Sequence, residues 1–175
     1  MLTGSVDTRD TYSFKYGKIE VRMKTNRKRG NFPAAWMSAM MDGEDKRYGE
    51  IDIVEMFGNM GRAYHTAHTE MTFKLKKRGP RQSFDEKLDY TKWHVYGMIW
   101  TESQLVWTVD GKKVGEYNRL DTPQMIADGQ WTFDRPFFIL LNQSVGDGSQ
   151  EKLLYPKVSE VYETRFDWVR VYQRK

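Results

Sequence analysis

Apolar and polar residues alternate in several short runs of this chain. Between Gly17 and Met23, apolar side chains such as Ile19 and Val21 alternate with charged ones. A period of two is typical of an antiparallel strand with one buried face. Phe137–Leu141 is apolar throughout and predicts a further strand.

A hairpin signal lies in the second half of the chain. The runs Gln104–Val109 and Lys112–Tyr117 flank the dipeptide Asp110-Gly111, which supplies the positive φ angles of a tight hairpin turn. Phe166–Tyr172 is rich in β-branched and aromatic residues and predicts a last strand. Helical periodicity is weak, and only Thr122–Ala127 favours a short helical turn.

Many short strands separated by turn signals predict an all-β fold, a β-sandwich or a jelly roll. The chain has 175 residues, enough for one compact domain with a substantial core. No repeat, low-complexity tract or linker divides the sequence, so we predict a single domain over residues 1–175.

Composition excludes several classes of function. The chain has no cysteine, which rules out disulfides, thiolate metal sites and a cysteine nucleophile. Its apolar stretches are too short to cross a bilayer, and the early Asp7, Arg9 and Asp10 give no sign of a signal peptide. A net charge of +4 is mild, and no nucleic-acid-binding module is visible, so we expect no nucleic-acid partner. Nothing in the sequence fixes an oligomeric state.

Basic residues concentrate in two runs, Lys24–Arg29 and Lys74–Arg81. Each run contains or adjoins glycine, which favours the interpretation as a solvated loop. A rim that binds phosphate or sulfate is the other interpretation, and the sequence leaves both open.

The strongest indication of chemistry is Gly49–Gly58, where three acids lie among apolar residues. In a regular strand, Glu50 and Asp52 share one face and Glu55 lies on the other. A single β-bulge at Ile53–Val54 would absorb the extra residue and return Glu55 to the acidic face. All three carboxyl groups would then line one side of one strand.

The spacing of the outer pair favours one class of reaction. Glu50 and Glu55 would lie roughly 13 Å apart at Cα, which inclined side chains reduce to about 5–7 Å between carboxyl groups. Retaining glycosidases need about 5–5.5 Å and inverting ones about 6.5–9.5 Å, so the estimate favours retention. Asp52 would raise the proton affinity of both neighbours by like-charge repulsion. The alternative is a solvent-facing strand whose acids pair with nearby basic residues.

Six segments, in order along the chain, carry a family resemblance. They are Gly4–Met23, Gly30–Met37, Gly49–Gly58, Trp93–Gly111, Pro136–Gly146 and Phe166–Tyr172. Together they resemble glycoside hydrolase family 16 in its laminarinase-type form, whose signature is Glu-x-Asp-x-x-Glu. The resemblance implies a jelly-roll β-sandwich of two antiparallel sheets with a concave substrate cleft. It also implies an extracellular, cell-surface or periplasmic location.

Position by position, the resemblance implies roles for individual residues. Glu50 would be the nucleophile, Glu55 the general acid/base and Asp52 the assisting carboxylate. Trp36 would stack on a sugar ring, and His68 would lie near the cleft. The ordinary alternatives are that Trp36 is buried in the core and that His68 is a strand histidine whose hydrogen bonds are all made within the protein.

Trp131 and Asn142 are weaker candidates for sugar subsites. Trp131 is equally well explained as an ordinary aromatic residue of the sandwich, and Asn142 as a side chain that satisfies backbone groups at the end of a strand. His65 should face away from His68, because residues three apart lie on opposite faces of a strand. Two histidines so arranged make a poor metal pair.

The chain also departs from the family pattern. Phe32 stands where the first Trp is usual, and the loop Asp147–Lys152 lacks an aromatic residue that many members carry. The chain starts at the first recognisable strand, so we expect it to lack the amino-terminal strands of the family. Asp167 could supply one ligand of a structural Ca²⁺, but its expected partners are absent, so we predict no metal. The reaction requires no cofactor.

The sequence therefore predicts an endo-acting retaining hydrolase whose partner is a polysaccharide, a β-1,3- or mixed β-1,3/1,4-glucan. Hydrolysis of agar- or carrageenan-type galactans is the nearest alternative, with the basic runs meeting sulfates. A further alternative, from a different class of protein, is a jelly roll that binds glycans without cleaving them. Transglycosylation would use the same three acids.

Overall fold

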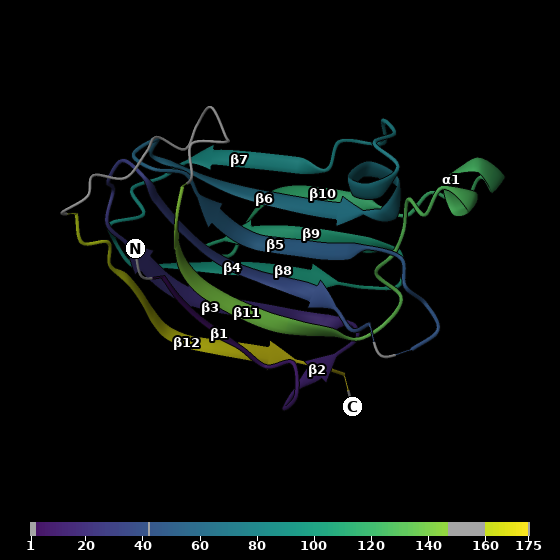
Figure 1. The fold of residues 1–175 in the computed structure, drawn as a ribbon, viewed down its shortest axis with the longest axis horizontal. Helices are drawn as coiled ribbons and strands as arrows, with labels where there is room; N and C mark the ends of the chain where they lie inside the picture. Colours follow the sequence, from purple (N-terminus) through teal and green to yellow (C-terminus); the bar gives the residue numbers. More distant parts are fainter. Residues whose placement is uncertain (1–2, 42, 147–159, 175) are drawn as a thin grey trace.

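Strands of the chain form two antiparallel sheets that lie face to face (Figure 1). The computed structural model describes residues 3–41, 43–146 and 160–174. In spatial order the first sheet contains β1 (Gly4–Asp7), β11 (Phe137–Val145), β4 (Asn31–Ala39), β5 (Gly49–Met56), β6 (Arg62–Thr69) and β7 (Ser83–Lys87), with β2 (Ser13–Phe14) also paired to β11. The second contains β10 (Lys112–Asn118), β9 (Gln104–Val109), β8 (His94–Trp100), β3 (Gly17–Thr25) and β12 (Thr164–Tyr172). The predicted all-β sandwich of two antiparallel sheets is confirmed.

The alternating pattern predicted for β3 is confirmed. Ile19, Val21 and Met23 have no exposed surface, whereas the charged residues between them are half-buried. The predicted hairpin β9–β10 is confirmed as well. It turns at Asp110 and Gly111, whose φ angles are 48° and 78°. Glycine adopts positive φ without a steric cost, and aspartate tolerates it better than most residues.

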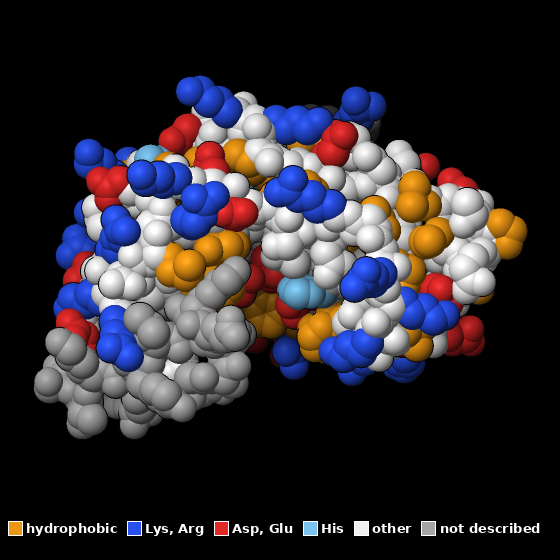
Figure 2. Space-filling model, turned by 90° about the horizontal axis from the view of Figure 1, so that it is seen from above, with side chains coloured by type: hydrophobic (Ala, Val, Ile, Leu, Met, Phe, Trp, Pro, Cys, Tyr) orange, Lys and Arg blue, Asp and Glu red, His pale blue; other side chains and the backbone are white. Residues whose placement is uncertain are grey.

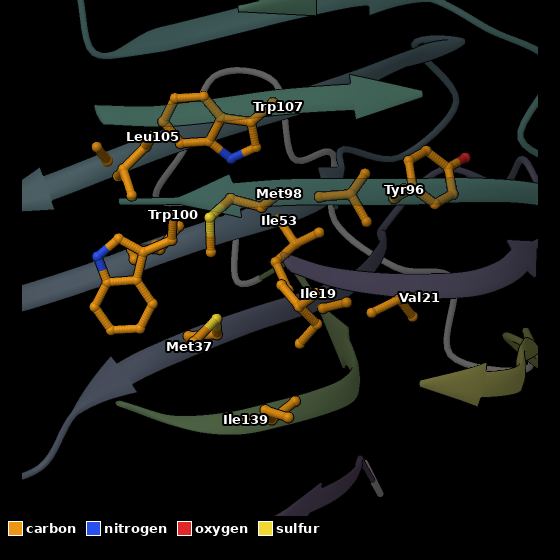
Figure 3. Close-up of a cluster of buried hydrophobic side chains, with 14 of the residues drawn as sticks. Ile19, Val21, Met37, Ile53, Tyr96, Met98, Trp100, Leu105, Trp107 and Ile139 are labelled. Atoms are coloured by element: carbon orange, nitrogen blue, oxygen red, sulfur yellow. The ribbon is translucent and has the colours of Figure 1, made fainter. Parts of the chain in front are cut away.

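The core lies between the two sheets (Figure 3). Met37, Ile53 and Ile139 come from the first sheet, and they face side chains of the second, including Met98 and Trp107. Complete burial of each such aliphatic side chain stabilises the fold by about 1.5–3 kcal/mol. The core therefore fixes the position of β5, the strand that carries the acids.

One core hydrogen bond reaches this strand directly. The indole Nε1–H of Trp107, in β9, donates to the backbone carbonyl of Asp52 at 2.9 Å. A buried indole needs an acceptor, and this one is supplied by the opposite sheet. The bond holds the middle of β5 against the core.

Two short helical segments complete the described part of the chain. The π-helical turn η1 (Glu70–Lys74) follows β6, and α1 (Pro123–Ala127) is capped by the Thr122 side chain, which accepts from Met125 N–H. The short helix predicted near Thr122 is confirmed. No helix among the described residues is long and apolar enough to cross a membrane. The segment Asp147–Lys152, singled out in the sequence, lies outside the described residues.

Candidate active site

A β-bulge interrupts β5 at the predicted position. Against β4, Trp36 pairs with Asp52 and Ala35 pairs with Val54, so Ile53 is the extra residue. Against β6, the register also shifts between Asp52 and Glu55. The bulge predicted at Ile53–Val54 is therefore confirmed.

The bulge separates the apolar and acidic residues of β5. Ile53 and Val54 are fully buried in the core, while Glu50, Asp52 and Glu55 together line a hollow of about 300 Å³. The remaining lining residues come from β1, β4 and β11: Ser5, Phe32, Ala34, Trp36, Asn142 and Ser144. Figure 2 shows red carboxylates and a pale-blue histidine at the bottom of a hollow in this face. The three acids thus share one concave site.

Burial raises the pKa of two of these acids. The Glu55 pKa lies well above its ordinary value, chiefly because the carboxyl is desolvated and secondly because of the nearby charge of Asp52. The Asp52 pKa is also well raised, first by burial and then by the charge of Glu50. Asp52 and Glu55 are hydrogen-bonded to each other. Desolvation therefore adds to the like-charge repulsion expected from the sequence, and it is the larger cause.

Glu50 is contacted by two side chains from outside its own strand. Tyr48 donates its hydroxyl to Oε2 of Glu50 at 2.6 Å. On β6, Nε2 of His68 lies 3.1 Å from Oδ2 of Asp52 and 3.6 Å from Oε1 of Glu50. Glu50 thus has the Tyr48 hydroxyl on one carboxylate oxygen and the His68 ring near the other.

Trp36 and Asn142 lie together on the other side of the acids. The Trp36 indole Nε1–H donates to Oδ1 of Asn142 at 2.7 Å. Both residues line the hollow with the acids, and Trp36 is only half-buried. Core burial, the ordinary alternative for Trp36, therefore does not describe it.

Trp131 does not belong to this group. Its side chain is buried in the core cluster, where it stacks on Tyr117 and meets Phe133 edge to face. It does not line the hollow with the acids. The expectation of a sugar subsite at Trp131 is corrected here: neighbouring aromatic residues enclose the ring, as in an ordinary sandwich core.

His65 faces away from His68, as the strand parity predicts. It is fully buried, and its Nδ1 lies 2.6 Å from the carbonyl oxygen of Ile53 in the bulge. Because a carbonyl only accepts, Nδ1 carries the proton. Burial lowers the His65 pKa to about 4, so the ring is neutral at neutral pH and tethers the bulge by one hydrogen bond.

Sequence reasoning missed the aromatic neighbours of Glu50. Tyr48 stacks on Phe73 of η1, with ring centroids 4.1 Å apart, and Phe73 meets His68 edge to face. Tyr48 lies two residues before Glu50, so its closeness to the motif was a usable signal. Phe73 gave none, because only the turn of η1 brings it back to β5.

The site also has the donor set of a metal centre. Ligand atoms of Glu50, Asp52 and His68 all lie within 4.8 Å of one another. Tyr48 and Glu55, however, already engage Glu50 and Asp52 through hydrogen bonds. That no metal takes part stays a prediction.

A second hollow, of about 650 Å³, lies away from the acids between the ends of β3, β8 and β12. Its lining includes Tyr16, Trp100 and Glu102. It gathers no comparable set of carboxyl groups, so the smaller hollow is the better candidate for an active site.

Comparison with known proteins finds similar sequences over nearly the whole chain. The chain matches the family described as Glycosyl hydrolases family 16 over residues 2–151. The β-glucanase of Rhodothermus marinus is 32% identical over 95% of this chain and 60% of the relative. The keratan-sulfate endo-1,4-beta-galactosidase of Sphingobacterium multivorum is 31% identical over 97% of this chain and 40% of the relative. The chain therefore spans less than two thirds of these curated relatives.

Among solved structures, the catalytic domain of an endo-1,3-beta-glucanase (laminarinase) from Thermotoga petrophila RKU-1 has a TM-score of 0.80 and 30% identity. The match covers 98% of this chain and 69% of that structure. The jelly-roll form of the sandwich is thereby confirmed.

Proposed function

Because the chain belongs to glycoside hydrolase family 16, we propose that it is an endo-acting retaining hydrolase of β-1,3- or mixed β-1,3/1,4-glucan. The observation that carries the proposal is the gathering of Glu50, Asp52 and Glu55 on one face of a bulged strand. A glucanase and a laminarinase domain among the similar proteins support glucan as the substrate.

The first step divides the work between the two glutamates. Glu55, whose raised pKa favours its protonated form, donates its proton to the oxygen of the scissile bond. Glu50, oriented by the hydroxyl of Tyr48, acts as the nucleophilic carboxylate and attacks the anomeric carbon from the opposite side. The carbon–oxygen bond to the leaving sugar breaks as the glycosyl–enzyme ester forms.

The second step returns the enzyme to its starting state. Glu55, now a carboxylate, takes a proton from a water molecule. The water oxygen attacks the anomeric carbon and releases the carboxylate of Glu50, so the product retains its β configuration. Asp52, whose own pKa is raised, is hydrogen-bonded to Glu55; a proton that Asp52 itself carries would stabilise the Glu55 carboxylate between the steps.

Residues in the hollow and beside it would bind sugar. Trp36 offers an indole face to a pyranose ring, and Asn142 fixes that indole through its hydrogen bond. His68, close to both Asp52 and Glu50, is positioned to donate to a sugar hydroxyl group. Because polymeric glucans do not enter cells, we propose that the reaction takes place outside the cytoplasm.

A galactan hydrolase is the second candidate, and one similar protein supports it. The similar galactosidase from Sphingobacterium multivorum matches 97% of this chain. The catalytic steps would be the same, and only the recognition of the sugar would differ.

The test is the release of reducing sugar, with sizing of the products, from laminarin, mixed-linkage β-glucan, agarose and κ-carrageenan. We expect internal cleavage of a glucan, and proton NMR of early products should show the β anomer. Glu50→Gln should abolish cleavage. Glu20→Gln, which changes a half-buried acid of β3 outside the hollow, is the matched control and should keep it.

Cleavage of a galactan alone would replace the leading proposal with the second candidate. Binding without cleavage, by folded wild-type protein under all conditions, would contradict the enzyme proposal. An α anomer among the first products would contradict retention.

A further inference from the structure

Two stacked aromatic rings beneath two lysines border the acids on the β6 side of β5. We call Tyr48, Phe73, Lys74 and Lys76 the lysine–aromatic shelf. Nζ of Lys76 lies 4.7 Å from the centroid of the Phe73 ring. Nζ of Lys74 lies 5.4 Å from the Tyr48 ring and 5.6 Å from the Phe73 ring. These distances are typical of cation–π contacts.

The shelf adjoins the acids of the catalytic hollow. Tyr48 donates to the carboxylate of Glu50, and the Phe73 ring lies 5.9 Å from the His68 ring. A sugar next to the one that Glu50 attacks would therefore come within reach of the shelf. Blue side chains gather beside the pale-blue histidine of the hollow (Figure 2).

The basic run Lys74–Arg81 is not uniform. Lys77 forms an ion pair with Asp128, and Arg81 donates to the Ser83 carbonyl and lies over the Phe84 ring. Within the described ranges, neither lysine of the shelf forms an ion pair with a carboxylate, and both have aromatic rings beneath them. The shelf therefore has positive charge available for a ligand.

The backbone around the shelf is unusual in two ways. The turn η1 has π-helical geometry, with Leu75 N–H donating to Glu70 C=O at 3.0 Å. Lys76 has a φ of 54°, a left-handed conformation that costs a residue with a β-carbon about 1–3 kcal/mol. Both features concentrate at functional sites. Here they accompany a lysine placed over Phe73.

We propose that the lysine–aromatic shelf binds a sugar unit that carries an anionic substituent, a sulfate ester or a carboxylate. An uncharged pyranose stacks on an open ring, whereas two ammonium groups overlie these rings. An anion placed between the ammonium groups is attracted by both of them. The inference rests on the proposed function, because it names the substrate class of the same cleft.

Calorimetric titration of the inactive Glu50→Gln protein tests the proposal without turnover. The probes are laminari-oligosaccharides of equal length in neutral, sulfated and carboxymethylated form, at low ionic strength. We expect at least one anionic probe to bind about tenfold more tightly than the neutral one, a preference that two partly exposed ion pairs can supply. The better of the two probes identifies the substituent.

Substitutions of the lysines make the test specific. In the same background, Lys74→Gln/Lys76→Gln should remove the preference, and Lys74→Arg/Lys76→Arg should keep it. The control Lys87→Gln/Lys92→Gln removes equal charge elsewhere on the surface and should also keep it. High salt should weaken the preference, because exposed charges are screened.

Equal affinity for all three probes would overturn the proposal. An equal loss in the control variant would also overturn it, because the attraction would then come from net charge alone. Hydrolysis of neutral laminarin by the wild type separates the two proposals. Cleavage without a preference for anionic probes would contradict only the proposal for the shelf. A preference for anionic probes without any cleavage would contradict only the proposal that the chain is a hydrolase.

Discussion

Strands β3 and β5 contribute to the same core and follow different rules. In β3, apolar and charged residues alternate without interruption, and each apolar residue is buried. In β5 a bulge interrupts the alternation, so that Ile53 and Val54 both enter the core and Glu55 joins the acidic face. The regular strand only stabilises the fold. The irregular strand also buries Asp52 and Glu55, whose desolvation costs free energy. The candidate catalytic acids lie on this strand.

The largest effect should come from an acid on the bulged strand. Glu55→Ala should lower the rate of glucan cleavage by about 10²–10⁴-fold, the usual contribution of a general acid/base. Azide should restore turnover of an aryl glycoside with a good leaving group, because it replaces the deprotonated water and yields a β-glycosyl azide. Glu20→Ala on β3 should leave the rate unchanged. Failure of azide to accelerate the variant would contradict the role of Glu55.

The regular strand should show the opposite behaviour. Ile19→Ala, which leaves a cavity in the core, should reduce the free energy of unfolding by about 2–5 kcal/mol. Below its unfolding transition the variant should keep the wild-type kcat. Denaturant titration and kinetics on the same samples check both points. A fall in kcat of the folded variant would mean that β3 also shapes the site.

The tether of the bulge should connect stability and activity. His65→Leu removes the donor to Ile53 C=O, and an unsatisfied buried carbonyl costs about 1–3 kcal/mol. We expect kcat to fall about 10–100-fold as well, because displacement of Glu55 by about 1 Å misaligns the proton donor.

His65→Asn is the matched control, since its amide can donate from nearly the same position as Nδ1. It should recover much of kcat. If the His65→Leu and His65→Asn variants have the same kcat, the role of His65 is packing alone.

The smallest effect concerns the dependence of stability on pH. Folding raises the pKa of Glu55 above its ordinary 4.5, so the folded state binds the proton more tightly than the unfolded state. Stability from this group is therefore greatest at low pH and is lost as pH rises towards the folded pKa. Glu55→Gln keeps a neutral donor, so it should be more stable than wild type by about 1 kcal/mol near pH 7.5.

Thermal unfolding of wild type and Glu55→Gln, at about pH 4 and pH 7.5, measures this difference. Taking the difference between the two proteins cancels the opposing contribution of His65, whose lowered pKa destabilises the fold as pH falls. A stability advantage that is independent of pH would contradict the raised pKa.

The sequence by itself determined the strands, the hairpin and the position of the bulge. These features depend on local rules: alternation at a period of two, the φ preference of Asp110-Gly111, and the parity of Glu50, Asp52 and Glu55. A bulge at Ile53–Val54 was the simplest way to bring the acids together, and the register of β5 contains it. Matches to family motifs predicted that Trp36, His68 and Asn142 lie at the substrate cleft.

Only the tertiary structure decided which aromatic residues lie in the site. Trp131, a subsite candidate by sequence, lies in the core, whereas Phe73, which no sequence pattern indicates, stacks on the tyrosine that contacts Glu50. It also assigned His65 to the bulge and made burial the main cause of the raised pKa of Glu55. These outcomes depend on contacts between segments distant in the chain and on the exclusion of water, and neither follows from local periodicity.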